Sequence, residues 1–228
     1  MKTSAIVVLA IFTLCLFSAV VGANTVITDV SQSGFANDQN TKIGVDGFGN
    51  EVTSVIDQRD MFNDQDTKIK VGGFGNEVDT GATQAGIAND QDNKIGVKGI
   101  ANEVTTIVDQ TGALNNDKTK VNVAGIANKV GTQSTQTGAL SNDKTTVNVR
   151  GFANDVTTID TQTGLFNNKK TSVSTIGAFN EVGTSTTQSG IANNQRTDIR
   201  VSGFGNDVQT MVTQSGAGNG QTVQVNVN

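Results

Sequence analysis

A strict internal repeat constrains the fold of this chain more than any other feature. A Gly followed three residues later by Asn recurs along the chain as far as Gly216, always at the spacing that separates Gly34 from Gly47. Asp60 replaces the Gly in one copy, and Ser141 replaces the Asn in another. Gln stands two residues before every other one of these positions, so the true unit has 26 residues in two equal halves. These residues are Gln32, Gln58, Gln84, Gln110, Gln136, Gln162, Gln188 and Gln214. Stacked copies of one short unit predict a solenoid.

The residues between the turns alternate with period two, which is typical of a strand with one buried face. One strand of each unit follows the pattern Val-x-Thr/Ser-x-apolar-x-Gln, and its first position is Val in all eight copies from Val26 to Val208. The apolar position is occupied instead by Ser134, Asp160 and Thr186 in three later copies. The other strand follows Thr-x-Ile-x-Val-x-Gly, as in residues 41–47. Each unit therefore contains two strands and two turns.

These features predict an all-β fold, a β-solenoid of about eight 26-residue rungs, in which two parallel sheets face each other across a thin core. Each strand would pair in parallel with its equivalent one rung on, which gives a stack about 38 Å long. Buried Val and Ile would form apolar ladders. We expect the Gln amides, the Thr hydroxyls and the Asn side chains to bond to their own copies in the rungs above and below.

The turns carry the aromatic residues. All eight Phe residues after position 23 lie between a turn Gly (or Asp60) and its Asn, at Phe35, Phe48, Phe62, Phe74, Phe152, Phe166, Phe179 and Phe204. We expect them to fill a fixed volume under each turn. The Gly residues would supply positive φ angles, and the Asn residues, which tolerate the left-handed region, would bond to their own backbone.

Residues 1–23 have the features of a signal peptide. Met1 and Lys2 give a short positive start, residues 5–17 are almost wholly apolar, and Val21-Gly22-Ala23 supplies small residues for cleavage. We predict a mature chain of residues 24–228, formed by a single repeat domain and secreted to the cell surface or the extracellular space. A retained membrane anchor is the alternative, but the apolar segment barely reaches spanning length.

The composition argues against catalysis. The chain has no His, and its one Cys, Cys15, lies in the apolar N-terminal segment. No imidazole base, thiolate nucleophile or nitrogen or sulfur metal site is therefore expected, so we predict neither enzyme activity, nor a cofactor, nor a metal, nor a small-molecule substrate. The net charge of −5 includes no basic stripe, which argues against nucleic acid as a partner.

The motif Gln-x-Gly-x-x-Asn resembles the curlin repeat. Residues 32–37, 84–89, 162–167 and 188–193 carry it, and the likeness extends over the whole of residues 24–228, although curlin units are shorter. Curlin repeats build curli, the extracellular functional amyloid of biofilms. The chain is more loosely similar to the amyloid-like sheath proteins of methanogenic archaea. The resemblance implies a secreted structural protein that polymerises.

The two ends of the repeat domain indicate how it would polymerise. The first strand presents Val26 and Val30, and the last presents Val223, Val225 and Val227 in the same register. Because each set could complete the ladders of the other, we expect the chain to be its own partner, adding head to tail into a fibre or sheath. A nucleator or a secretion accessory protein is a further candidate partner.

A monomeric binding solenoid is the alternative function, above all an ice-binding protein. Thr-Gln-Thr or Thr-Gln-Ser recurs at residues 135–137, 161–163, 187–189 and 213–215. If Gln points inward, the flanking hydroxyls point outward in two rows. The rows are interrupted at residues 57–59 and at Asp109. An adhesin or phage-fibre segment is a third class.

Overall fold

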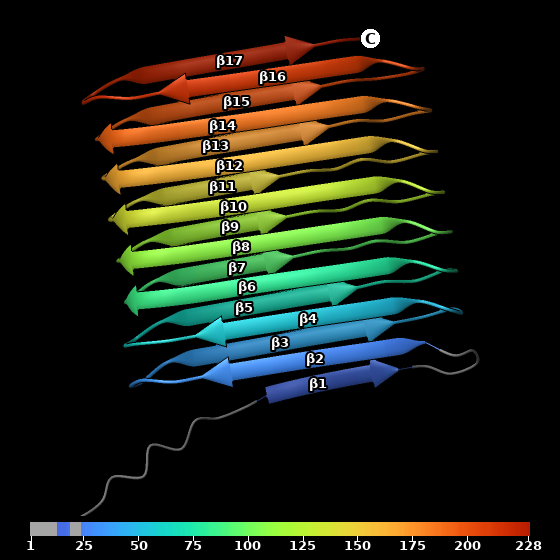
Figure 1. The fold of residues 1–228 in the computed structure, drawn as a ribbon, viewed down its shortest axis with the longest axis horizontal. Coiled ribbons are helices and arrows are strands. Elements are labelled where there is room, and N and C mark those ends of the chain that lie inside the picture. The colour runs from blue at the N-terminus through green and yellow to red at the C-terminus, as the bar shows by residue number, and fades with distance from the viewer. Residues whose placement is uncertain (1–12, 19–23) are drawn as a thin grey trace, which may run out of the picture.

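The computed structural model describes residues 13–18 and 24–228, and it is built of strands and turns in two parallel sheets. The chain winds through both sheets once per repeat unit, so that successive rungs stack from β2 at the bottom to β17 at the top (Figure 1). The predicted β-solenoid of about eight rungs is confirmed. In the described residues, no helix is long and apolar enough to cross a membrane.

We name the two sheets A and B. Sheet B contains β2 (Thr25–Gln32), β4 (Glu51–Gln58), β6 (Glu77–Ile87), β8 (Glu103–Ala113), β10 (Lys129–Ala139), β12 (Asp155–Leu165), β14 (Glu181–Ile191) and β16 (Asp207–Gln214). Sheet A contains β1 (Thr13–Ser18), β3 (Asp38–Val45), β5 (Asp64–Lys70), β7 (Asp90–Lys94), β9 (Asn116–Lys120), β11 (Asn142–Thr146), β13 (Asn168–Ser174), β15 (Asn194–Arg200) and β17 (Gly220–Asn226). From β2 onward every strand pairs with its equivalent in the neighbouring unit, as Val130 does with Val156.

The core lies between the sheets and is made of stacked ladders. Burial alternates along each strand, as in β4, where Val52, Ser54, Ile56 and Gln58 face inward and are buried. One continuous apolar cluster runs through the rungs, built from the Val that begins each sheet B strand and the Ile and Val of sheet A. The period-two pattern of the sequence therefore corresponds to the buried face.

Most turns after sheet B strands require Gly for a steric reason, although the turn after β4 has Asp60 in this place, with a φ of 76°. At Gly112, φ is +127°, and an added Cβ would lie 1.8 Å from the carbonyl oxygen of Gly138 in the next rung. The left-handed residue of this turn is Leu114 (φ 56°), and Asn115 is not among the residues with positive φ. Asn115 does not use the left-handed region that Asn tolerates. Its side chain does bond to the backbone of its own turn as expected, because the Nδ2 atom donates to the carbonyl oxygen of Thr111 at 3.3 Å, and it also donates to that of Gly138 in the next rung at 3.0 Å.

The Phe side chains do not pack beneath the turns, contrary to our expectation. Phe62, Phe152 and Phe204 are 53%, 57% and 86% exposed, and the others lie at the turn surface as well. The space under each turn is taken by the turn Asn, which is buried from Asn50 to Asn193. Because the Asn side chain bonds to backbone carbonyls there, the large apolar side chains are directed outward.

β1 falls within the predicted signal peptide and pairs with β3. Its register departs from that of the repeat, because Leu14 lies opposite Thr41 and Leu16 opposite Ile43, where the repeat spacing would pair them with Asn40 and Lys42. β1 thus covers the outer edge of β3 below the first rung (Figure 1). The rest of the predicted signal peptide, with the cleavage site at Ala23, lies outside the described residues.

Candidate functional site

The eight Gln residues form one column inside the solenoid. Each Nε2 atom donates to the Oε1 atom of the Gln one rung higher, from Gln32 to Gln214, at 2.9 to 3.1 Å. Several also donate to a backbone carbonyl of sheet A, as Gln110 does to Asp90 at 3.1 Å. Gln58 to Gln188 are fully buried. The column is therefore a continuous chain of amide hydrogen bonds along the solenoid axis.

The Thr hydroxyls do not form such ladders, contrary to our expectation. The buried hydroxyls of Thr28, Ser54, Thr80 and Thr106 have no hydrogen-bond partner. The reason is geometric, because rungs are about 4.8 Å apart and a hydrogen bond between two hydroxyl oxygens is about 2.8 Å long. An amide has its donor and acceptor about 2.2 Å apart, so it can span the same gap. Amides can therefore stack into hydrogen-bonded ladders where hydroxyls cannot.

The turn Asn residues behave differently at the two edges of the solenoid. At the turns that lead into sheet B, the Asn102 Nδ2 atom donates to the Asn76 Oδ1 atom at 2.8 Å, and this amide-to-amide pattern continues to Asn206. At the turns that lead into sheet A, the Asn115 side chain bonds only to backbone groups, including the N–H of Ser141 at 3.1 Å. Both sets tie each rung to the next.

The residues predicted to form the assembly ends lie at opposite ends of the stack. Val26 and Val30 are on β2, and Val223, Val225 and Val227 lie on or just after β17. All five point inward and are half-buried, where their equivalents in the middle rungs are fully buried. Within one chain the two sets therefore lie far apart, and the residues of each set pack against a neighbouring rung on one side only.

The polar ladders are also incomplete at the upper end. The Gln214 Nε2 atom and the Gln221 Oε1 atom are buried without a hydrogen-bond partner in the described chain. At the lower end, Gln32 donates to Gln58, and no described residue donates to the Gln32 Oε1 atom. Within the described residues, β2 and β16 each have a neighbouring strand on one side only. Each end therefore has unfilled hydrogen-bonding capacity of the kind that the other end supplies.

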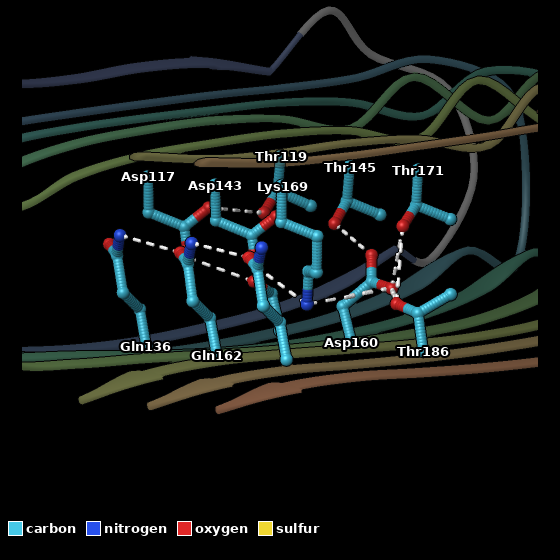
Figure 2. A network of polar contacts seen from close by, with 12 residues as sticks. Asp117, Thr119, Gln136, Asp143, Thr145, Asp160, Gln162, Lys169, Thr171 and Thr186 are labelled. Carbon is cyan, nitrogen blue, oxygen red and sulfur yellow. Dashed lines mark hydrogen bonds and ion pairs between the residues drawn. The ribbon is translucent and has the colours of Figure 1, made fainter. Parts of the chain in front are cut away.

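A buried cluster of charged residues lies in the upper half of the core, and our reading of the sequence missed it. Asp117, Asp143 and Lys169 extend from sheet A toward Asp160 of sheet B (Figure 2). The Lys169 Nζ atom lies 3.0 Å from Asp143 Oδ2 and 3.7 Å from Asp160 Oδ1. Hydroxyl groups of the neighbouring Ser and Thr residues complete the network. Ser134 donates to Asp117 at 2.9 Å, Thr171 donates to Asp160 at 2.8 Å, and Thr145 and Thr186 also donate to Asp160.

Burial controls the protonation of this cluster. It raises the pKa of Asp117 well above the usual value, and the neighbouring Asp143 carboxylate raises it further. Burial also raises the pKa of Asp143 to about 6, although Lys169 opposes the shift. The Lys169 ammonium is disfavoured by burial, but Asp143 and Asp160 outweigh this effect and raise its pKa. At neutral pH the cluster thus holds a charged Lys169 beside ionised Asp143, and the raised pKa of Asp117 favours its protonated form.

The sequence did contain the signal for this cluster. Asp117, Asp143 and Lys169 each stand two residues before an inward-facing Thr of sheet A, so period-two alternation places them on the buried face. Their column contains Gln39, Gln65, Gln91 and Gln195 in other rungs. The facing column changes from apolar residues to Ser134, Asp160 and Thr186 in the same rungs. The charged residues of the sheet A column and the polar residues of the facing sheet B column therefore satisfy each other across the core.

The outer face of sheet A is strongly charged in the lower rungs. Asp38, Asp64 and Asp90 lie in one row, and a row containing Asp66 and Asp92 lies next to it. Burial and the neighbouring Asp residues raise the pKa values of Asp64 and Asp66. A parallel row of lysines follows along the same strands, at Lys42, Lys68, Lys94 and Lys120. This flat face is therefore a solvated, charged surface.

Comparison with known proteins assigns no family to the chain: no family model, curated protein or solved structure matches it. A functional proposal must therefore be based on the ladders and the two ends of the solenoid.

Proposed function

We propose that the chain is a secreted structural subunit that polymerises end to end into an extracellular amyloid-like fibre or sheath. The observation that carries the proposal is the complementarity of the two ends. A second copy placed on the upper end would continue the same register, so that its Val26 would stack on Val208 and its Gln32 on Gln214. The resemblance of the repeat to curlin agrees with this assignment.

The hydrogen bonds support the same contact. Every Gln below Gln214 donates upward, so the partnerless Gln214 Nε2 atom would donate to the Oε1 atom of Gln32 in a second copy. Asn206 accepts nothing through its own Oδ1 atom in the described chain, whereas each Asn below it accepts the N–H of the next rung, as Asn180 does at 3.2 Å. One interface would thus extend the Gln and Asn ladders together.

Sheet A adds a condition to this proposal. In a polymer, β17 of one copy would pair with the outer edge of β3 in the next, and β1 occupies that edge. Cleavage after Ala23 would remove β1 and leave β3 open. The proposal therefore applies to a chain that starts at Asn24, and export and assembly would be linked through the same cleavage.

Proline substitution at the upper edge tests the proposal. The Val227 N–H donates to Arg200 of β15, so by alternation the N–H of Gln224 points toward the open edge. In the chain starting at Asn24, Gln224→Pro should slow polymer growth, measured by light scattering, because it removes an edge donor without breaking the pairing of β17 with β15. Circular dichroism of the soluble fraction should show the rungs still folded. Growth at the wild-type rate would refute the end-to-end contact.

Ice binding remains a second candidate because of one specific arrangement. The strands β10, β12, β14 and β16 place Thr135, Thr161, Thr187 and Thr213 in register, with Thr137 and Thr163 in a neighbouring row. The rows lie on the outer face of sheet B at spacings of about 4.8 Å across the strands and about 6.7 Å along them. A thermal-hysteresis assay decides between the candidates: a structural subunit should leave ice growth unchanged.

A further inference from the structure

Both turn edges of the solenoid expose large apolar side chains in nearly every rung. We call the turns that follow sheet B strands the first turn edge, and the turns that follow sheet A strands the second turn edge. The exposed residues of the first turn edge are Phe35, Met61, Phe62, Ile87, Leu114, Leu140, Leu165, Phe166 and Ile191. Those of the second are Phe48, Phe74, Ile100, Ile126, Phe152, Ile176, Phe179 and Phe204. A continuous apolar stripe of this length is unusual on an isolated soluble protein and indicates an interaction surface.

The two stripes differ in the charges beside them. The second turn edge is flanked by an exposed row that is acidic at Glu51, Glu77, Glu103, Asp155, Glu181 and Asp207. Lys129 stands in this row between Glu103 and Asp155 and pairs with Glu103 at 3.1 Å. The first turn edge has acidic residues beside it in the lower three rungs only. From Thr111 onward its flanking residues are Thr, Ser, Asn or Gly, and the turns between them contain no charge. The first turn edge can therefore approach another apolar surface without bringing charges together.

We propose that the first turn edge docks against the first turn edge of a second copy, so that polymers pair side by side. This inference rests on the proposed end-to-end assembly. The matching surface is present by symmetry, because both copies carry one large apolar side chain per rung at the same spacing. In an antiparallel pair, docking through the second turn edge would bring two mainly acidic rows together, which is unfavourable.

The charges are compatible with an antiparallel arrangement of the two copies. The acidic residues that flank the first turn edge, Asp38, Asp64 and Asp90, lie in the lower rungs of each copy. In an antiparallel pair, related by a two-fold axis, these rungs face the upper rungs, where the flanking residues are Asn168, Asn194 and Gly220. The antiparallel pair is an isologous contact that closes on itself, so it joins two polymers.

The size of the stripe explains why pairing depends on polymerisation. An edge about 38 Å long and about 10 Å wide buries about 400 Å² on each copy, or about 800 Å² in total. This falls short of the roughly 1,200 Å² that a specific stable interface needs. Copies joined end to end add their stripes, so a polymer of four copies would bury about fourfold more. Single copies should therefore remain unpaired while polymers associate.

The test compares two pairs of substitutions in the chain starting at Asn24. Leu114→Lys with Leu140→Lys places charge on the first turn edge. Ile126→Lys with Phe152→Lys places the same charge on the second turn edge in neighbouring rungs. All four residues are exposed and have φ between 55° and 61°, so the backbone environments match. Electron microscopy gives the mass per unit length and the width of the polymers, and circular dichroism verifies folding.

We expect wild-type polymers and the second-edge variant to have twice the mass per unit length of the first-edge variant, with equal growth in length. Pairing is refuted if wild-type polymers are a single solenoid wide, or if both variants lower the mass per unit length equally. In either case the end-to-end proposal stands. Absence of polymers from all three proteins would instead refute the proposed function and the pairing with it.

Discussion

Replacing Gln110 by Leu tests the amide column directly. The Gln110 Nε2 atom donates to Gln136 Oε1 at 3.0 Å, and the Gln110 Oε1 atom accepts from Gln84 Nε2 at 2.9 Å. In Gln110→Leu, the fully buried Gln136 Oε1 atom loses its donor, whereas Gln84 still donates to the carbonyl of Asp64 at 3.0 Å.

The magnitude follows from these partners. An orphaned buried acceptor costs about 1 to 3 kcal/mol, and the two other lost hydrogen bonds, from Gln84 and to the Asp90 carbonyl, add about 1 kcal/mol each. The free energy of unfolding should therefore fall by roughly 3 to 5 kcal/mol. A change at Thr111, which is exposed, should have little effect.

Gln195 provides a matched control with the opposite expectation. Its side chain is also buried, but neither its Nε2 nor its Oε1 atom has a hydrogen-bond partner. Gln195→Leu removes two unsatisfied polar atoms from the core, so it should raise the free energy of unfolding by about 1 to 3 kcal/mol.

Urea unfolding followed by circular dichroism measures both variants, in the Gln224→Pro background, where polymerisation is expected to be slow. Shifts of equal sign and size for Gln110→Leu and Gln195→Leu would refute the amide column, because burial alone would then explain the effect.

Three further predictions follow from the turns, the charged cluster and β1. Gly112→Ala should strongly lower the urea midpoint, since its Cβ would lie 1.8 Å from the Gly138 carbonyl oxygen, and an unchanged midpoint would contradict the turn geometry. The raised pKa of Asp117 makes its contribution to stability complete below about pH 4 and progressively lost as pH rises. The free energy of unfolding of Asp117→Asn relative to wild type should therefore rise by about 1.4 kcal/mol per pH unit from about pH 4 up to the raised pKa of Asp117, and parallel pH profiles would refute this. The chain starting at Asn24 should polymerise faster than the full chain in light scattering, and equal rates would show that β1 does not block the β3 edge.

The sequence pattern was sufficient to predict the fold because every rung repeats the same buried positions. A shift of one residue would place Val52 and Gln58 on the solvent face, so the alternation left only one consistent register. The predicted 26-residue unit and the parallel pairing of equivalent strands were confirmed.

The errors have physical causes that a residue pattern does not reveal. Thr80 belongs to a position that is Thr or Ser in every copy, and Phe152 belongs to a turn position that is usually large and apolar. Recurrence alone does not show whether such a side chain spans the distance between rungs or points outward from a turn. The charged cluster was missed because Lys169 and Asp160 lie on different sheets, and only their packing across the core pairs them.

Cysteine cross-linking between the two ends tests the central claim most directly. In the chain starting at Asn24, which lacks Cys15, Asp29→Cys and Met211→Cys place thiols on the exposed faces of β2 and β16, in the same row of sheet B. Within one copy they are seven rungs apart, about 34 Å, and cannot form a disulfide. Across an end-to-end contact they would be adjacent strand partners about 4.8 Å apart, within disulfide range.

The account predicts that mild oxidation yields a ladder of disulfide-linked multimers on a non-reducing gel. A control with Asp29→Cys and Gln133→Cys, which puts the second thiol in the middle of the same row, should yield no such ladder. Absence of multimers from the end-to-end pair, or an equal ladder from the control, would contradict end-to-end assembly.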